Sequence, residues 1–189
     1  MEILIDESGS FTTLKSQPNS WSVVAAYVTP ETEKRHYKQA LFELKKRCMV
    51  GSKEIKLHQI NECDYFAFLQ DLGKLKGVLF AVGTDSYFND NDFIESHKLK
   101  HLQVIISSVD KMKYEGGKEA QRILADELKN ISLQLYIQLA CQVTLILSII
   151  ERAIVYYAQR TPTTLCSFKW RIDQKEPLKK LIMKVVLRN

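Results

Sequence analysis

Glycine and proline are scarce in this sequence, with seven and four residues among 189. Flexible linkers are rich in glycine, and stiff ones are rich in proline. Their scarcity argues against long structureless segments and predicts a high helix content. A chain of this length can form one domain with a sizeable core but is short for two. We therefore expect a single domain over residues 1–189.

Cysteine is also sparse, and its spacing is uninformative for metal binding. The four cysteines are far apart and include no CxxC pair; they are Cys48, Cys63, Cys141 and Cys166. This pattern indicates neither a zinc ribbon nor a disulfide framework, so we expect free thiols in a reducing cytoplasm. The N-terminus does not combine a basic region with an apolar core, so no signal peptide is predicted.

No strong excess of one charge is present. The formal net charge is +5, and charged residues make up 26% of the chain. This balance is compatible with a polyanionic partner such as a nucleic acid. It excludes a dedicated basic arm of the kind that binds nucleic acid through charge density alone.

One hydrophobic run is long enough to consider as a membrane span. Residues 131–150 contain no charged side chain, but Gln134, Gln138 and Gln142 recur at every fourth position. Amide side chains are poorly tolerated against lipid, so the stripe favours a core helix and no membrane contact. The apolar helix over 131–157 is also a candidate surface for a homo-oligomer.

The order of hydrophobic segments predicts an α/β fold. Apolar runs of strand length are expected at 3–6, 21–28, 77–83 and 166–173, and helices at 31–48, 62–72, 93–113, 118–160 and from 176 onward. A single helix over 118–160 would be too long for a compact domain, so a break is predicted at 130–132. Glu115-Gly116-Gly117 predicts another break. Asn61 is expected to cap the helix from Glu62, and Asp90-Asn91-Asp92 the helix from Phe93. The run at 77–83 is continuously apolar and is expected to be a central strand buried on both faces.

Three of the predicted strands end in an acid, namely Asp6, Asp85 and Asp173. Two carboxylates about 4 Å apart repel by about 4 kcal/mol at an effective dielectric of 20. A divalent cation such as Mg²⁺ or Mn²⁺ reverses that repulsion, binds phosphate oxygens and activates water. Acids at strand ends are also ordinary turn residues, which is the favoured interpretation for Asp85.

The opening MEILIDESGS and three later segments carry a family resemblance. LIDESGSF, the apolar strand after it, EIKLHQI and FKWRIDQK resemble, in this order, a family of uncharacterised bacterial and mobile-element proteins that begin with a DESG motif. That family is assigned a ribonuclease-H-like fold. The resemblance therefore implies a mixed sheet built on the first strand, with a helical insertion over about 93–160.

The resemblance also implies a site for a metal-dependent nuclease. Asp6, Glu54 and Asp173 would hold Mg²⁺ or Mn²⁺ and act in catalysis. Other side chains implied beside the site are Glu7, Lys56 and His58, and those implied to contact the nucleic-acid backbone are Lys169, Arg171 and Lys175. Members of the family usually continue with a late Asp-bearing helix, so the resemblance implies that this sequence is C-terminally incomplete or belongs to a degenerate member.

Alternatives exist for the function and for each residue. The chain could be a non-catalytic module that keeps the fold and binds nucleic acid or a protein. Strand alternation places Asp6 and Glu7 on opposite faces, so only Asp6 is expected to face the metal. Glu54 lies in a charge run typical of a solvated surface, and Asp173 shares a strand face with cations that could simply pair with it. His97 and His101 form half of a zinc site, although a solvated face with Lys98 and Lys100 is favoured.

Overall fold

The computed structural model describes residues 1–13, 19–51 and 53–172. These residues form two compact units. The first contains 1–4, 27–79 and 152–171, and the second contains 5–26, 80–151 and Ile172. Several elements pass from one unit into the other, so each unit is built from segments far apart in the sequence.

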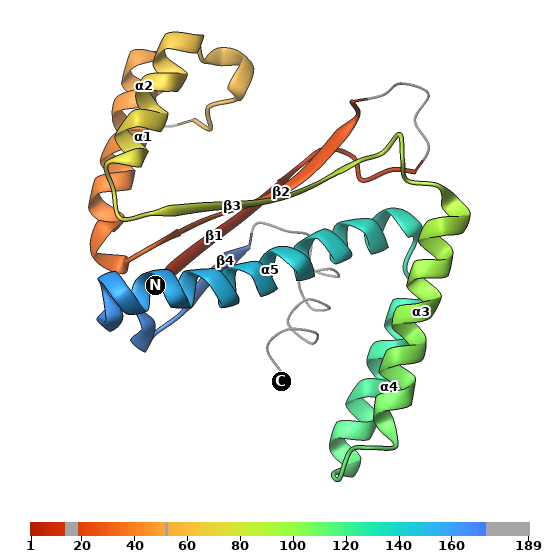
Figure 1. The fold of residues 1–189 in the computed structure, drawn as a ribbon. Coiled ribbons are helices and arrows are strands. Elements are labelled where there is room, and N and C mark those ends of the chain that lie inside the picture. The colour runs from red at the N-terminus through yellow and green to blue at the C-terminus, as the bar shows by residue number, and fades with distance from the viewer. Residues whose placement is uncertain (14–18, 52, 173–189) are drawn as a thin grey trace. The chain divides into compact units, whose positions relative to one another are not determined.

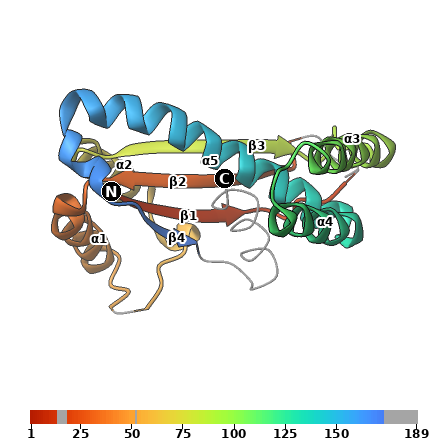
Figure 2. The same ribbon diagram turned by 90° about the horizontal axis from the view of Figure 1, so that it is seen from below.

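Within the described residues, four strands form one sheet in the order β3-β2-β1-β4 (Figure 2). They are β1 (Glu2–Ser8), β2 (Trp21–Thr29), β3 (Val78–Asp85) and β4 (Lys169–Ile172). Gly77 lies against Tyr27 and Gly83 lies against Val23, so β2 and β3 run in opposite directions. The Lys169 amide donates to the Met1 carbonyl, so β4 starts beside the start of β1. The expected α/β fold with a mixed sheet is confirmed, and β1 lies in the interior of the sheet.

The expectation for 77–83 is wrong in one respect. β3 forms where it was predicted, but it is a sheet edge, and alternate residues along it are exposed. Leu79 is 67% exposed, and the next two positions on that face are Ala81 and Gly83. A continuous apolar run can therefore belong to a strand that packs one face and exposes apolar residues on the other.

The first unit contains a pair of packed helices. They are α1 (Lys34–Arg47), preceded by the 3₁₀ turn η1 (Glu31–Glu33), and α2 (Glu62–Gly73), preceded by η2 (Leu57–Gln59). The Asn61 side chain accepts a hydrogen bond from the Asp64 amide at 2.9 Å and caps α2 as predicted. A further 3₁₀ segment, η3 (Pro162–Cys166), includes the first residue of the strand predicted from Cys166, and β4 begins only at Lys169.

The second unit contains the antiparallel helices α3 (Asn91–Val109) and α4 (Glu115–Asn130), which pack side by side (Figure 1). The Asp90 carboxylate accepts from the amides of Asp92 and Phe93 and caps α3, as predicted. The predicted break at Glu115–Gly117 is wrong, because α4 begins at Glu115 and the glycines occupy its first turn. The first amides of a helix have no intrahelical partner, so glycine is tolerated there.

Helix α5 (Leu133–Arg160) starts after the predicted break at 130–132. One row of its buried side chains recurs every four residues, at Ile137, Cys141, Leu145, Ile149, Ala153 and Tyr157. By length and composition the helix could cross a membrane, and 44% of its most apolar window is buried within the protein. Core helices pass the same test, so a core position without membrane contact stays a prediction, as does its use in a homo-oligomer.

Candidate functional site

The DESG motif lies at the end of β1, within the second unit. Along β1 the side chains of Ile3 and Ile5 are buried, whereas Asp6 is exposed. Successive strand residues point to opposite faces, so Asp6 and Glu7 diverge as predicted. The strand continues to Ser8, two residues beyond its predicted end.

Gly9 makes the turn that ends β1. Its φ is +107°, a conformation that side chains with a Cβ rarely adopt. A Cβ at Gly9 would lie 2.6 Å from the Ser22 Cα atom on β2. The Ser22 hydroxyl in turn accepts a hydrogen bond from the Phe11 amide at 2.9 Å. The glycine of the motif is therefore required by the close approach of two backbone segments.

Two amides of the glutamine stripe on α5 contact this motif. Gln134 Nε2 donates to the Ser10 carbonyl at 2.7 Å, and Gln142 Nε2 lies 3.4 Å from Glu7 Oε2. Gln142 is 1% exposed, and its Oε1 atom has no hydrogen-bond partner within the described part of the chain. The sequence predicted the stripe as a mark of a core helix, and the structure adds that the stripe holds the residues after Asp6.

The Asp6 side chain is oriented by a hydrogen bond from the next backbone amide. Its Oδ1 atom accepts a hydrogen bond from the Glu7 amide at 2.8 Å, and the side chain is exposed. This local bond restricts the rotamers of Asp6 and leaves the carboxylate facing solvent. A single oriented carboxylate at a strand end is suited to binding a hard cation or a hydrogen-bond donor.

The other predicted metal ligands lie outside the described part of the second unit, which contains Asp6. Glu54 belongs to the first unit, where its carboxylate pairs with Lys56 Nζ at 2.7 Å and both side chains are exposed. His58 lies in η2 and is also exposed. Asp173 and Lys175 lie outside the described residues. The set of Asp6, Glu54 and Asp173 therefore stays a prediction.

A donor set of three His, Cys, Asp or Glu side chains is not found anywhere in 1–13, 19–51 and 53–172. Mg²⁺ is commonly held by one or two carboxylates, with waters and substrate phosphates as the remaining ligands. Asp6 is compatible with that role, because its oxygens are hard ligands and its side chain is accessible. Asp6 therefore remains a candidate ligand, and the metal site stays a prediction.

Two predicted contacts of nucleic acid are engaged in ion pairs within the first unit. Lys169 Nζ pairs with the Glu31 carboxylate, and Arg171 Nε lies 2.6 Å from the Glu2 carboxylate. Glu2 also accepts hydrogen bonds from Tyr37 and Lys34. The burial of this carboxylate was not predicted from the sequence, because an acid at the start of a strand is ordinary.

Asp85 is the last residue of β3, and its carboxylate caps the turn that follows, in agreement with the favoured structural interpretation. Its carboxylate accepts hydrogen bonds from the backbone amides of Asn19, Ser20 and Tyr87 at 3.0–3.1 Å.

The favoured interpretation of the α3 histidines, a solvated helix face shared with Lys98 and Lys100, is wrong for Lys98, which is 5% exposed. Its Nζ atom donates to the carbonyls of Lys129 and Ile131, at the end of α4. A lysine can be buried there because those carbonyls lack intrahelical partners.

Comparison with known proteins identifies no relative: the chain matches no protein-family model, no curated protein and no solved structure.

Proposed function

We propose that this chain is a metal-dependent nuclease or nucleic-acid-processing protein with a ribonuclease-H-like fold, in which Asp6 is the first metal ligand. The observation that carries the proposal is the position of Asp6. It is an exposed, locally oriented carboxylate at the end of an interior strand of a mixed sheet. Strand ends are where open α/β sheets commonly bind ligands.

The residues after Asp6 support this role by fixing its backbone. Gly9 allows the tight turn against Ser22, and Gln134 holds the Ser10 carbonyl. Gln142 contacts Glu7 on the opposite face, which keeps the second acid away from the face of Asp6. A fixed backbone reduces the entropy lost when a carboxylate binds an ion.

A bound Mg²⁺ or Mn²⁺ would polarise a phosphodiester and activate water for its hydrolysis. Glu54 and Asp173 remain the proposed additional ligands, with Glu7, Lys56 and His58 nearby. Lys169, Arg171 and Lys175 are the proposed contacts of the phosphate backbone. Because Lys169 and Arg171 already neutralise Glu31 and Glu2, we expect each to contribute less to nucleic-acid binding than an unpaired cation would.

The direct test is cleavage of labelled RNA, DNA and RNA–DNA hybrid by the full chain in Mg²⁺ and in Mn²⁺. We expect cleavage that is abolished by EDTA and by Asp6→Asn. Asp126→Asn, which changes an exposed acid on α4, is the matched control and should retain full activity. Absence of cleavage of all three substrates, or equal cleavage by Asp6→Asn, would contradict the proposal.

The second candidate is a non-catalytic module that binds nucleic acid or a protein partner. The ion pairs of Lys169 and Arg171 favour it, because they give both side chains a structural task. Fluorescence anisotropy with the same oligonucleotides separates the two candidates. Binding that is unchanged by EDTA and by Asp6→Asn, without cleavage, indicates the module.

A further inference from the structure

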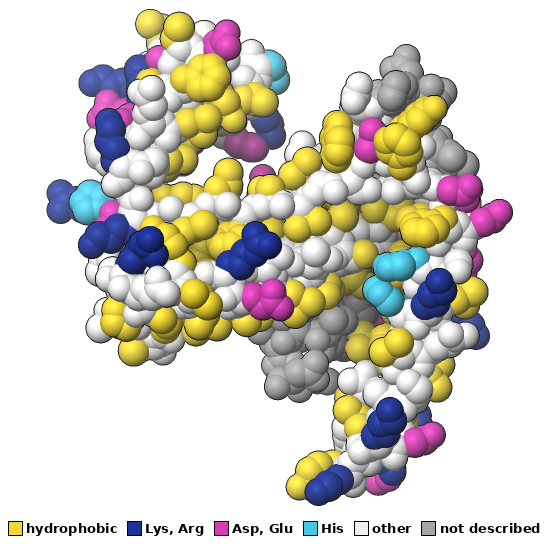
Figure 3. Space-filling model, in the orientation of Figure 1, with side chains coloured by type: hydrophobic (Ala, Val, Ile, Leu, Met, Phe, Trp, Pro, Cys, Tyr) yellow, Lys and Arg dark blue, Asp and Glu magenta, His cyan; other side chains and the backbone are white. Residues whose placement is uncertain are grey.

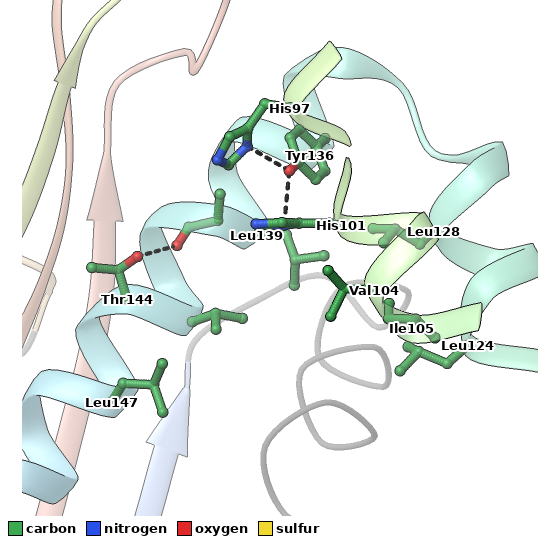
Figure 4. Close-up of a pocket in the computed structure, with 12 residues that line it drawn as sticks. His97, His101, Val104, Ile105, Leu124, Leu128, Tyr136, Leu139, Thr144 and Leu147 are labelled. Atoms are coloured by element: carbon green, nitrogen blue, oxygen red, sulfur yellow. Dashed lines mark hydrogen bonds between the residues drawn. The ribbon is translucent and has the colours of Figure 1, made fainter. Parts of the chain in front are cut away.

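A second group of polar side chains lies apart from the DESG motif, within the second unit. His97 and His101 are one helical turn apart on α3, and Tyr136 on α5 lies between them (Figure 4). Tyr136 Oη is 2.7 Å from His97 Nδ1 and 2.9 Å from His101 Nδ1. The phenol oxygen therefore lies within hydrogen-bond distance of two imidazole nitrogens.

This cluster lies at one end of a cavity of about 490 Å³. The other walls are mostly apolar side chains of α3, α4 and α5, including Val104, Ile105, Leu124, Leu128, Leu139 and Leu147. Tyr136 is 2% exposed, whereas histidine side chains reach the surface over α3 (Figure 3). The cluster is thus accessible from solvent on the histidine side, whereas Tyr136 lies in the protein interior.

The phenol of Tyr136 and the two imidazoles are joined by hydrogen bonds. A phenol has one proton, so it can donate to one imidazole while accepting from the other. A cation could take the place of the phenolic proton, while the proton on the second imidazole moves from Nδ1 to Nε2. Both Nδ1 atoms and the phenolate oxygen would then be free to coordinate the cation, with release of one proton.

The donor types narrow the choice of ion. The separations of 2.7 and 2.9 Å are those of hydrogen bonds, which a bound ion would replace. Imidazole nitrogen suits Cu²⁺, Ni²⁺ and Zn²⁺. Tetragonal sites of nitrogen and oxygen ligands are typical of Cu²⁺ and Ni²⁺.

We propose that His97, His101 and Tyr136 form a binding site for a divalent transition-metal ion of tetragonal preference, Cu²⁺ or Ni²⁺. The cavity side provides room for water or a small ligand to complete the coordination. This site is independent of Asp6 and of the proposed nuclease. The sequence indicated only half of it, because the third donor is a tyrosine 35 residues further along the chain.

The test titrates the chelator-treated full chain with Ni²⁺ by calorimetry and with Cu²⁺ by visible absorption. The background carries Cys63→Ser and Cys166→Ser, because exposed thiols also bind these ions. We expect one ion per chain and a phenolate-to-copper charge-transfer band. His97→Gln and His101→Gln should each weaken Ni²⁺ binding at least tenfold, and Tyr136→Phe should remove the band.

The control variants are His36→Gln and His58→Gln, which change the other histidines of the chain and should leave the affinity unchanged. Circular dichroism of each variant verifies that the helices persist. Equal affinity in His97→Gln, His101→Gln and the background would overturn the site and leave a purely structural hydrogen-bond cluster. A charge-transfer band that survives Tyr136→Phe would overturn the assignment of the third ligand.

Discussion

Arg171 on β4 and Glu2 on β1 form an ion pair, with the guanidinium Nε 2.6 Å from the carboxylate. The Glu2 side chain is 1% exposed, whereas that of Arg171 is 59% exposed. Tyr37 and Lys34 donate to the same carboxylate at 2.7 and 3.2 Å. The start of β1 is therefore joined to β4 and α1 through one buried charge, and Arg171 has a structural role whatever the function.

The first prediction concerns Glu2→Gln. Burial alone would raise the pKa of Glu2, but the hydrogen bonds from Tyr37 and Lys34 and the charge of Arg171 outweigh it and lower the pKa. We expect the substitution to cost about 1–3 kcal/mol at pH 7, because it removes the charge-assisted part of these bonds. Urea unfolding measures the loss, and Glu54→Gln, at an exposed acid, should stay within about 0.5 kcal/mol of the wild type.

The pH dependence of the stability difference between wild type and Glu2→Gln follows from the lowered pKa of Glu2. A carboxylate with a lowered pKa in the folded state stabilises the protein above its unfolded pKa of about 4.5, and the effect is lost as pH falls through the folded value. The stability gap between wild type and Glu2→Gln should therefore be largest near neutral pH and shrink below about pH 4.5. A gap of constant size down to pH 3 would contradict this role of Glu2.

The second prediction concerns the glycine of the DESG motif. Gly9→Ala introduces a Cβ 2.6 Å from the Ser22 Cα atom at a backbone φ of +107°. We expect a loss of about 3 kcal/mol or more in the free energy of unfolding, from conformational strain and overlap together. Gly51→Ala is the control, since Gly51 also has a positive φ but no atom within 4 Å of the added Cβ. It should cost only about 1 kcal/mol, and equal losses would show that overlap with Ser22 is unimportant.

Local patterns in the sequence predicted approximately where helices and strands form, but not which of these elements lie beside one another. The caps at Asn61 and Asp90 and the break at 130–132 depend on side chains within a few residues, and all three are correct. The edge position of β3 depends instead on which strands pair, and an apolar run does not specify that. The burial of Lys98 likewise could not be predicted from local sequence, because its acceptors are backbone carbonyls at the end of another helix.

The candidate sites show the same division. The alternation of β1 correctly separates Asp6 from Glu7, since that depends only on strand geometry. The contacts of Gln134 and Gln142 with the motif, and of Tyr136 with two histidines, join segments that are 35 to 135 residues apart. A single sequence contains no signal for such pairs beyond the residue types themselves.

The third prediction concerns Lys98→Met. The substitution keeps the apolar stem but removes two hydrogen bonds to the carbonyls of Lys129 and Ile131, at 2.9 and 2.8 Å. We expect a loss of about 2 kcal/mol, because charge-assisted bonds at a buried site are strong and the carbonyls lose their donor. Lys100→Met, at an exposed position of the same helix, should change stability by less than about 0.5 kcal/mol. Thermal or urea unfolding of both variants measures the difference, and similar losses would contradict the capping role.

The fourth prediction concerns Tyr157→Phe near the end of α5. The buried Tyr157 hydroxyl lies 2.8 Å from the Val28 carbonyl and 2.9 Å from the Lys76 carbonyl, so it serves two strand-end acceptors with one proton. Removing it leaves both carbonyls short of a donor in the core of the first unit, and we expect a loss of about 1–2 kcal/mol. Tyr156→Phe is the matched control, because that neighbouring ring contacts Arg160 through its face and keeps this contact without the hydroxyl. Urea unfolding should therefore separate the two variants, and hydrogen exchange should show faster opening around Val28 only in Tyr157→Phe. Equal stability of the two variants would mean that the two carbonyls find other donors, such as water, once the hydroxyl is gone.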